Sequence, residues 1–346
     1  MQITPEVKAQ LEEQKKQCVF CKLISGEMEA KKVFEDNIVI GMLDIYPAKK
    51  GHVLYMLKEH YPIMPYIPPD EFKHFFGLVP KVCGAIKEGL VTTGANLFIA
   101  NGFVAGQKAA HFLANVFPRD NGDGFFNFLF KLRDNTLTEE QIKMLGHNFP
   151  LMMNNHFTRN PAEWHKGKGE VPNFLKEIYE SSIPIYEDEK VLCILPNKEL
   201  IGGHIEIYSK LEEKFIEKLS IEDSSHLFFT ASFAATALFE GLKAQGTNII
   251  LKSGFSDDNK EGKLCVHVLP RSENDGLQGM MWEPKPPKDE LDVVLKKIKE
   301  EVWKIKYVEE KKVEEKKREP EVIKIKVEKK ESSSDEIRKA LERIKR

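Results

Sequence analysis

The sequence predicts an α+β fold in which two similar domains follow one another in a single chain. The first observation is an internal repeat, because glycines and turn residues coincide without a gap when the sequence is shifted by 152 residues. The second is the same order of short apolar strands around one long amphipathic helix in both copies. The third is a length of 346 residues with 41% apolar side chains, enough for two cores of ordinary size.

The repeat is carried by turn-forming and glycine-containing segments rather than by scattered apolar residues. A period this long excludes a solenoid, so the sequence indicates a duplicated domain. The segments that coincide are Gly51-His52 with Gly203-His204, Glu88-Gly89-Leu90 with Glu240-Gly241-Leu242, Gly102-Phe103 with Gly254-Phe255, and Pro118-Arg119 with Pro270-Arg271.

Each copy is expected to contain its elements in one order. A strand ending in an acidic turn comes first, then an apolar strand, a strand opened by Gly-His, a long helix, two strands and a closing helix. Thr138 and Gln141 have capping-box spacing at the first closing helix. The predicted ranges are 33–36, 38–43, 53–57, 69–90, 96–100, 114–117 and 138–145 in the first copy, and 185–188, 191–195, 205–208, 220–242 and 289–308 in the second.

These elements divide the chain into four parts. Residues 1–146 form the first domain, and residues 147–173, dense in Asn, Pro, Gly and Lys, form a linker. Residues 174–308 form the second domain, on which Trp303 and Tyr307 are expected to pack. Residues 309–346 form a charged tail with short strand and helix elements.

Composition narrows the function classes. The net charge is −2, but residues 285–346 carry a basic excess and the remainder is acidic, so only the tail suits a nucleic-acid-containing partner. No apolar run reaches the roughly 18–20 residues of a membrane span, and the first residues lack the pattern of a secretory signal. Five cysteines are too few and odd in number for a disulfide scaffold, which predicts a cytoplasmic protein.

The segment from Gly106-Gln107 through His111-Phe112-Leu113-Ala114-Asn115 to Pro118-Arg119 resembles the signature of the histidine triad (HIT) family. Supporting motifs upstream are Cys18-Val19-Phe20-Cys21, Leu43-Asp44-Ile45, Gly51-His52 and Lys58-Glu59-His60. The resemblance covers residues 18–146 and, more weakly, 177–308. Because members of the family are commonly homodimers with a sheet continued across the interface, it implies two tandem HIT-like domains arranged as an intramolecular pseudo-dimer that is monomeric.

The resemblance implies three histidines at alternate positions of one strand, the middle one attacking a nucleotide α-phosphate. Alternate residues share one face of a strand, and neutral imidazole is nucleophilic near pH 7. This sequence instead has His111, Leu113 and Asn115 in the first copy and Lys263, Cys265 and His267 in the second. Leu113 cannot attack phosphorus. Cys265, His267 and His52 are the remaining candidates, although a lone strand Cys is usually an inert apolar residue and His267 is expected to be a packed histidine.

The family resemblance also implies a structural zinc ion held by Cys18, Cys21, His60 and His111. Two thiolates and two imidazoles form the closed tetrahedral set that structural zinc prefers. The offsets equivalent to these positions in the second copy hold no such set, so no zinc is expected there. Since zinc needs His111, the presence of this histidine is not by itself a sign of catalysis.

A purine nucleotide is the ligand that the resemblance implies for the first domain. Asp44 stands where the family holds ribose hydroxyls, and Asn101, Gly106, Gln107 and Asn115 stand at or near phosphate-contacting positions. The alternative is that Asp44 and Asn101 only satisfy turns, as these residue types commonly do.

Three functions remain open from the sequence. The favoured one is a non-catalytic HIT-like protein with structural zinc and residual nucleotide binding, which acts as a binding or scaffold protein. The second is an active HIT-type nucleotide hydrolase or nucleotidyltransferase with an atypical nucleophile. The third is an RNA- or ribosome-associated factor, or a protein-binding factor, that acts through the basic tail.

Overall fold

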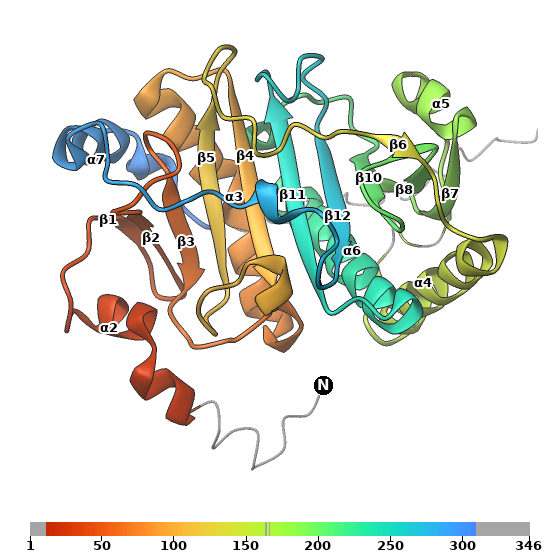
Figure 1. Cartoon of the computed structure of the whole chain (residues 1–346), viewed down its shortest axis with the longest axis horizontal. Coiled ribbons are helices and arrows are strands. Elements are labelled where there is room, and N and C mark those ends of the chain that lie inside the picture. The colour runs from red at the N-terminus through yellow and green to blue at the C-terminus, as the bar shows by residue number, and fades with distance from the viewer. Residues whose placement is uncertain (1–11, 163–164, 166, 309–346) are drawn as a thin grey trace, which may run out of the picture. The chain divides into compact units, whose positions relative to one another are not determined.

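A computed structural model describes residues 12–162, 165 and 167–308 of the chain. Its main feature is a ten-stranded antiparallel sheet in the order β1-β2-β3-β5-β4-β11-β12-β10-β8-β7 (Figure 1). A two-stranded sheet pairs β6 (Arg133–Asp134) with β9 (Lys198–Glu199). The strands of the main sheet are β1 (Lys32–Glu35), β2 (Val39–Leu43), β3 (Val53–Leu57), β4 (Gly94–Asn101), β5 (Leu113–Arg119), β7 (Ser182–Glu187), β8 (Val191–Pro196), β10 (Ile205–Ser209), β11 (Gly246–Gly254) and β12 (Cys265–Arg271).

The strand order reads the same from either edge of the main sheet toward its centre. The first half runs β1-β2-β3-β5-β4, and the second half repeats this order with β7, β8, β10, β12 and β11. The halves join through antiparallel pairing of β4 with β11, from Gly94 opposite Gly254 to Asn101 opposite Thr247. Residues related by the 152-residue shift therefore occupy equivalent places in the two halves.

Two long helices cover one face of the sheet, and both lie where the sequence predicts them. They are α3 (Pro69–Leu90) and α6 (Ile221–Leu242), which contact each other along their length. The rings of Phe76 and Phe228 stack with their centroids 4.6 Å apart. Pro80 has no amide hydrogen to donate to the carbonyl of Phe76, and the Ser224 hydroxyl donates to that oxygen instead at 2.7 Å. A proline inside α3 thus creates a contact with α6.

An aspartate and a histidine fix the acidic turn in both halves. Asp36 Oδ1 accepts the amides of Ile38 and Val39, each at 2.8 Å, and its other oxygen lies 2.7 Å from His74 Nε2. In the second half, Asp188 makes the equivalent contacts with two amides and with His226 Nε2 at 2.8 Å. These side chains satisfy backbone donors where each second strand begins.

The predicted linker at 147–173 is wrong over residues 147–159, which belong to α4 (Glu139–Arg159). The predicted capping box of Thr138 and Gln141 is present at its start. The helix continues through Pro150 because Leu145, Phe149, Met153 and Phe157, spaced by four residues, are buried. Burial of several large side chains outweighs the roughly 3 kcal/mol cost of an internal proline. The short helix α5 (Asn173–Glu180) follows the remaining part of the segment.

Each closing helix packs against the opposite half of the sheet. Helix α4 follows the first half but contacts α6 and β7, whereas α7 (Leu291–Lys299) follows the second half but contacts α3 and β1. Tyr307 stacks on His74 of α3 at 4.3 Å, so it packs on the first half and not on the second as expected, and Trp303 is 66% exposed. The tail elements expected within 309–346 lie outside the described residues. Among the described helices, none has the length and apolar character required to cross a membrane.

Candidate functional site

Four predicted metal ligands meet at one edge of the first half. Cys18 precedes helix α2 (Val19–Ser25), Cys21 lies in its first turn, His60 follows β3, and His111 precedes β5. Cys21 Sγ lies 3.3 Å from His60 Nδ1 and 3.6 Å from His111 Nδ1, and Cys18 Sγ lies 3.6 Å from His111 Nδ1. The four ligand atoms lie within 4.8 Å of one another.

This spacing fits a tetrahedral zinc ion. Bonds of about 2.3 Å to sulfur and about 2.0–2.1 Å to nitrogen separate neighbouring sulfur and nitrogen atoms by about 3.6 Å in a tetrahedron. His111 Nε2 donates to the Leu57 carbonyl at 2.9 Å, which directs the lone pair of Nδ1 toward the sulfurs. Burial and the neighbouring Cys18 raise the pKa of Cys21 to about 12, so a cation is needed to hold the Cys21 sulfur as a thiolate. The donor set and its geometry are compatible with zinc.

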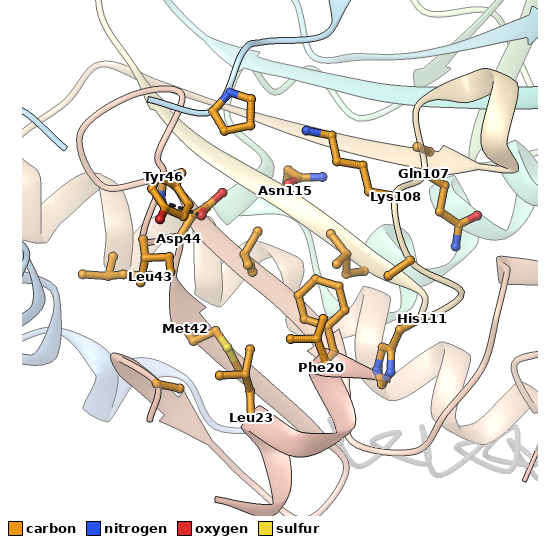
Figure 2. Close-up of a pocket in the computed structure, with 18 of the residues that line it drawn as sticks. Phe20, Leu23, Met42, Leu43, Asp44, Tyr46, Gln107, Lys108, His111 and Asn115 are labelled. Atoms are coloured by element: carbon orange, nitrogen blue, oxygen red, sulfur yellow. Dashed lines mark hydrogen bonds between the residues drawn. The ribbon is translucent and has the colours of Figure 1, made fainter. Parts of the chain in front are cut away.

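A pocket of about 420 Å³ lies beside this cluster, and we call it the first pocket. Four of the predicted ligand-binding residues, Asp44, Gly106, Gln107 and Asn115, line it. Figure 2 shows Asp44 on one side of the pocket and the Lys108 side chain extending across from the other. The apolar wall is formed by α2, β2, β3 and β4 residues together with Leu113 and a segment from the second half, and it includes Phe20, Leu23, Met42, Leu54, Phe98 and Trp282.

A polar chain runs along the wall of the first pocket from Asp44 through His52 to Asn115. Asp44 Oδ2 lies 3.3 Å from His52 Nδ1, and Asp44 Oδ1 accepts the Tyr46 amide at 2.9 Å. His52 Nε2 lies 3.0 Å from Asn115 Oδ1. Burial lowers the pKa of His52 to about 4, so the ring is neutral near pH 7. The Asp44 side chain is 20% exposed and presents an acceptor to the pocket.

The amide side chains predicted to contact phosphate already have partners within the protein. Gln107 accepts the Gly102 amide at 2.8 Å and donates to the Pro62 carbonyl at 2.5 Å. Asn115 donates to the Phe98 carbonyl at 3.3 Å. A phosphate in the first pocket would have to compete for these donors.

Asn101 does not lie in the first pocket, contrary to its expected role. Its Oδ1 accepts the Met64 amide at 3.2 Å, and its Nδ2 lies 3.3 Å from Thr247 Oγ1 in the other half of the sheet. The side chain therefore fixes a loop and the junction between β4 and β11. Both partners lie far from Asn101 in the sequence, so the alternative interpretation, in which Asn101 only satisfies a turn, does not describe it either.

Leu113 occupies the middle of the three alternate positions and lines the first pocket between His111 and Asn115. Alternate side chains share one face of a strand, whereas Phe112 and Ala114 point into the core. His111 is turned toward the two cysteine sulfurs. Strand β5 thus presents an aliphatic side chain to the first pocket at the position where the family resemblance implies a nucleophile.

Three wall residues of the first pocket, Met281, Trp282 and Pro284, come from the second half of the chain, and the sequence analysis did not predict them. The Trp282 ring meets His52 edge-on at 5.4 Å, and the Met281 side chain packs on Gly106, where a Cβ would lie 2.5 Å from its sulfur. Gly106 has a φ of +92°, a conformation that favours glycine. Leu129 and Phe130, which the 152-residue repeat makes equivalent to Met281 and Trp282, line a pocket in the other half. The repeat therefore offers a sequence signal that could have identified these wall residues.

That other cavity, which we call the second pocket, has a volume of about 540 Å³. Cys265 and His267, the other candidate nucleophiles, line it. Burial raises the pKa of Cys265 well above its usual value, so the sulfur is a thiol at neutral pH. His267 Nδ1 lies 3.0 Å from His204 Nε2, and burial lowers the pKa of both imidazoles. The pairing agrees with their interpretation as packed, hydrogen-bonded histidines.

Comparison with known proteins identifies the family. The HIT domain model matches residues 25–122. A HIT-like protein of Methanocaldococcus jannaschii is 43% identical over 107 residues, which are 31% of this chain and 82% of that protein. The chain belongs to the HIT family. An adenylylsulfatase of Arabidopsis thaliana is 36% identical over 106 residues, which are 31% of this chain and 54% of that enzyme.

Two solved structures match different lengths of the chain. A zinc-bound histidine triad protein from Mycobacterium smegmatis is 35% identical, covers 32% of this chain and 80% of its own, and has a TM-score of 0.30. An ADP-glucose phosphorylase from Arabidopsis thaliana with bound ADP-glucose covers 82% of this chain and 90% of its own, with 14% identity and a TM-score of 0.52. The second match shows a likeness of fold that extends across most of this HIT protein.

Proposed function

We propose that the chain consists of two HIT-like domains, one in each half of the main sheet, arranged as an intramolecular pseudo-dimer. The equivalent strand orders of the two halves and their antiparallel junction support this arrangement. The likeness of fold to one solved structure over 82% of the chain agrees with it. The exchange of closing helices between halves ties the two domains into one folding unit. Mass measurement under native conditions tests the proposal, which requires a monomer.

The first domain holds a structural zinc ion on Cys18, Cys21, His60 and His111. All four positions are filled by protein, so the ion has no open site for a substrate and supplies folding energy rather than Lewis-acid chemistry. The sulfur-to-nitrogen distances of 3.3–3.6 Å support this assignment. Metal analysis of freshly purified protein tests it, with one zinc per chain expected at this site.

The favoured function is that of a non-catalytic binding or scaffold protein derived from a nucleotide-processing fold. The observation that carries it is Leu113 at the middle triad position, beside a histidine already turned to the metal cluster. Without its nucleophile an enzyme of this kind loses several powers of ten in rate. Incubation with adenosine phosphoramidate and dinucleoside polyphosphates tests the proposal, because turnover above background contradicts it.

The ligand of the first pocket is a purine nucleoside or nucleotide. Asp44 presents a partly exposed carboxylate acceptor for ribose hydroxyls, and the neighbouring wall is apolar enough to hold a base. Gly106, Gln107 and Asn115 lie where the phosphate end would follow, with Lys108 as the cation that faces it (Figure 2). Calorimetric titration with adenosine and AMP tests this assignment, which fails if neither binds.

A second candidate function is nucleotide hydrolysis or transfer through the second pocket. It is favoured by the presence of Cys265 and His267 on one wall of that pocket and by relatives named as an adenylylsulfatase and an adenosine 5'-monophosphoramidase. Turnover that disappears in Cys265→Ala or His267→Ala, and survives in His52→Ala, would establish this candidate.

The proposal that the tail binds RNA or protein is tested by comparing the partners of the full chain with those of a chain ending at Val308.

A further inference from the structure

A second group of ligand-type side chains lies in the second half, away from the four-residue cluster. His204 immediately precedes β10, Glu206 lies on β10, and His267 lies directly opposite Glu206 on β12. Side chains two residues apart on a strand share a face, and a directly opposed pair on the neighbouring strand lies on that same face. The register therefore brings the three side chains together, and their ligand atoms lie within 4.8 Å of one another.

The atoms of this group face a common point. His204 Nε2 and His267 Nδ1 are 3.0 Å apart, and Glu206 Oε1 lies 3.6 Å from the nitrogen of His267 and 3.9 Å from that of His204. With metal–nitrogen bonds of about 2.1 Å, nitrogens 3.0 Å apart subtend about 90° at a metal ion. That angle matches two adjacent positions of an octahedron, and two histidines with one carboxylate form a known set for divalent transition metals.

Two ring nitrogens this close must share either a proton or a metal ion. A shared proton agrees with the Leu200 amide, which lies 3.4 Å from His204 Nδ1 and assigns the proton of that ring to Nε2. The shared proton engages only the two imidazoles, and Glu206 Oε1, which lies beyond hydrogen-bond distance of both nitrogens, takes no part in it. A metal ion would engage all three atoms. His204 Nδ1 would then carry the ring proton and could no longer accept the Leu200 amide, whose present contact is long at 3.4 Å. We propose that His204, Glu206 and His267 form a binding site for a divalent transition-metal ion.

The surroundings of the group hold its members in place. The Tyr208 hydroxyl donates to Glu206 Oε2 at 2.7 Å, which leaves Oε1 for the ion, an outer contact of the kind that orients metal-ligating carboxylates. The Phe130 ring meets the imidazoles of His204 and His267 edge-on, with centroids 5.8 and 5.0 Å away. The orientation of all three ligands is thus fixed before an ion binds.

The site faces the second pocket, so the ion keeps open positions. Glu206 and His267 line that pocket together with Lys252 and Lys263. Lys252 Nζ lies 3.6 Å from Asp258, which also pairs with Arg119 at 2.8 Å, and the Lys252 ammonium donates to the Phe128 carbonyl at 2.8 Å. An ion with three protein ligands and two lysines nearby suits an anionic oxygen ligand, such as phosphate or a carboxylate, at its remaining positions.

The first half provides an internal comparison. His52, Leu54 and Asn115 occupy the positions equivalent to His204, Glu206 and His267. An aliphatic side chain and an amide replace two of the three ligands, and His52 is hydrogen-bonded to Asn115. The same fold without these ligands therefore provides a matched site that should not bind the ion.

The test measures cobalt binding by the full-length protein with the first metal site removed. The chain carrying Cys18→Ser and Cys21→Ser is stripped of metal and titrated with Co²⁺, followed by metal analysis and absorption spectroscopy. One equivalent is expected, with weak d–d bands and no thiolate-to-cobalt charge-transfer band, because no sulfur is among the ligands. Adding Glu206→Gln or His267→Gln should abolish this equivalent, whereas Asn115→Ala, the first-half counterpart of a His267 variant, should leave it unchanged.

Two results would overturn the proposal. If the variant with Cys18→Ser and Cys21→Ser binds no equivalent of Co²⁺, the 3.0 Å contact between His204 Nε2 and His267 Nδ1 is a shared proton. Cobalt that persists unchanged in Glu206→Gln and His267→Gln places the ion elsewhere. Because ligand variants can fail to fold, circular dichroism is measured on each of them. A further variant, Tyr208→Phe, keeps all three ligands and should weaken cobalt binding about 10–100-fold. Unchanged affinity in folded Tyr208→Phe counts against the site.

Discussion

Removal of the metal from the four-residue cluster is expected to release helix α2 while the sheet remains folded. No residue of α2 is fully buried, and its contacts with the sheet are made by Phe20, Leu23 and Ile24, each only partly buried against the cluster of Ile40 and Met42. A metal ion on the four proposed ligands would therefore supply much of what holds this helix. At a free metal concentration 100-fold above its dissociation constant, the ion contributes about 2.7 kcal/mol, or about a 100-fold change in the opening equilibrium.

Hydrogen exchange measures this change amide by amide. The amides of α2 are expected to exchange about 100-fold faster after chelation, with zinc content followed by elemental analysis on the same samples. Strands β12 and β10 of the second half serve as the internal control, because β4 and β11 separate them from β5, which follows His111, and they should keep their protection. Unchanged exchange in α2 after the metal has been removed would refute the structural role assigned to it.

Three further outcomes concern the first pocket, the second pocket and pH. Asp44→Asn is expected to weaken adenosine binding about ten- to a hundredfold in calorimetry, because hydrogen bonds to a charged acceptor contribute about 1.5–3 kcal/mol; unchanged affinity would place the ligand elsewhere. Phosphoramidate turnover is expected at background level in both the wild type and Cys265→Ala, and a difference between them contradicts the non-catalytic proposal. Burial raises the pKa of Asp188, but hydrogen bonds led by that of His226 outweigh this and hold the pKa below its usual range. The resulting stability is present above the unfolded pKa of about 3.9 and is lost as pH falls through the lower folded value. In denaturant unfolding measured at a series of pH values, Asp188→Asn should therefore reduce the loss of unfolding free energy at acid pH. An unchanged loss would refute the stabilising role assigned to ionised Asp188.

The sequence predicts those parts of the fold that depend on local pattern and on the repeat. Helices α3 and α6 follow from apolar side chains at helical spacing, and the grouping of Cys18, Cys21, His60 and His111 follows from the resemblance to the HIT family. The extent of α4 does not follow, because Pro150 and the surrounding Asn and Gly residues are typical of a linker. Only the packing partner, α6 with β7, shows why Phe149 and Phe157 are buried there.

Contacts between the halves were the least predictable from sequence. Local pattern specifies that a closing helix is amphipathic, but not whether its apolar face packs on its own half or on the other. For the same reason Met281 and Trp282 were not expected in the wall of the first pocket. Asn101 was misassigned because its partner Thr247 belongs to the strand across the central junction. Each of these errors involves a partner that is distant in the sequence, beyond the reach of periodicity or capping rules.

The two halves differ where side chains face the pockets and agree where side chains satisfy the backbone. The acidic turns keep an aspartate paired with a histidine in both halves, and Arg119 and Arg271 each bind an aspartate four residues later. Loss of such a partner leaves buried donors without acceptors, which costs about 1–3 kcal/mol per group. The pairs of equivalent residues that face the pockets differ between the halves: Leu54 and Glu206, Leu113 and Cys265, Asn115 and His267. One fold thus supports an apolar pocket beside a closed metal cluster in one half and a pocket rich in titratable groups in the other, so the chemistry of each half has to be tested separately.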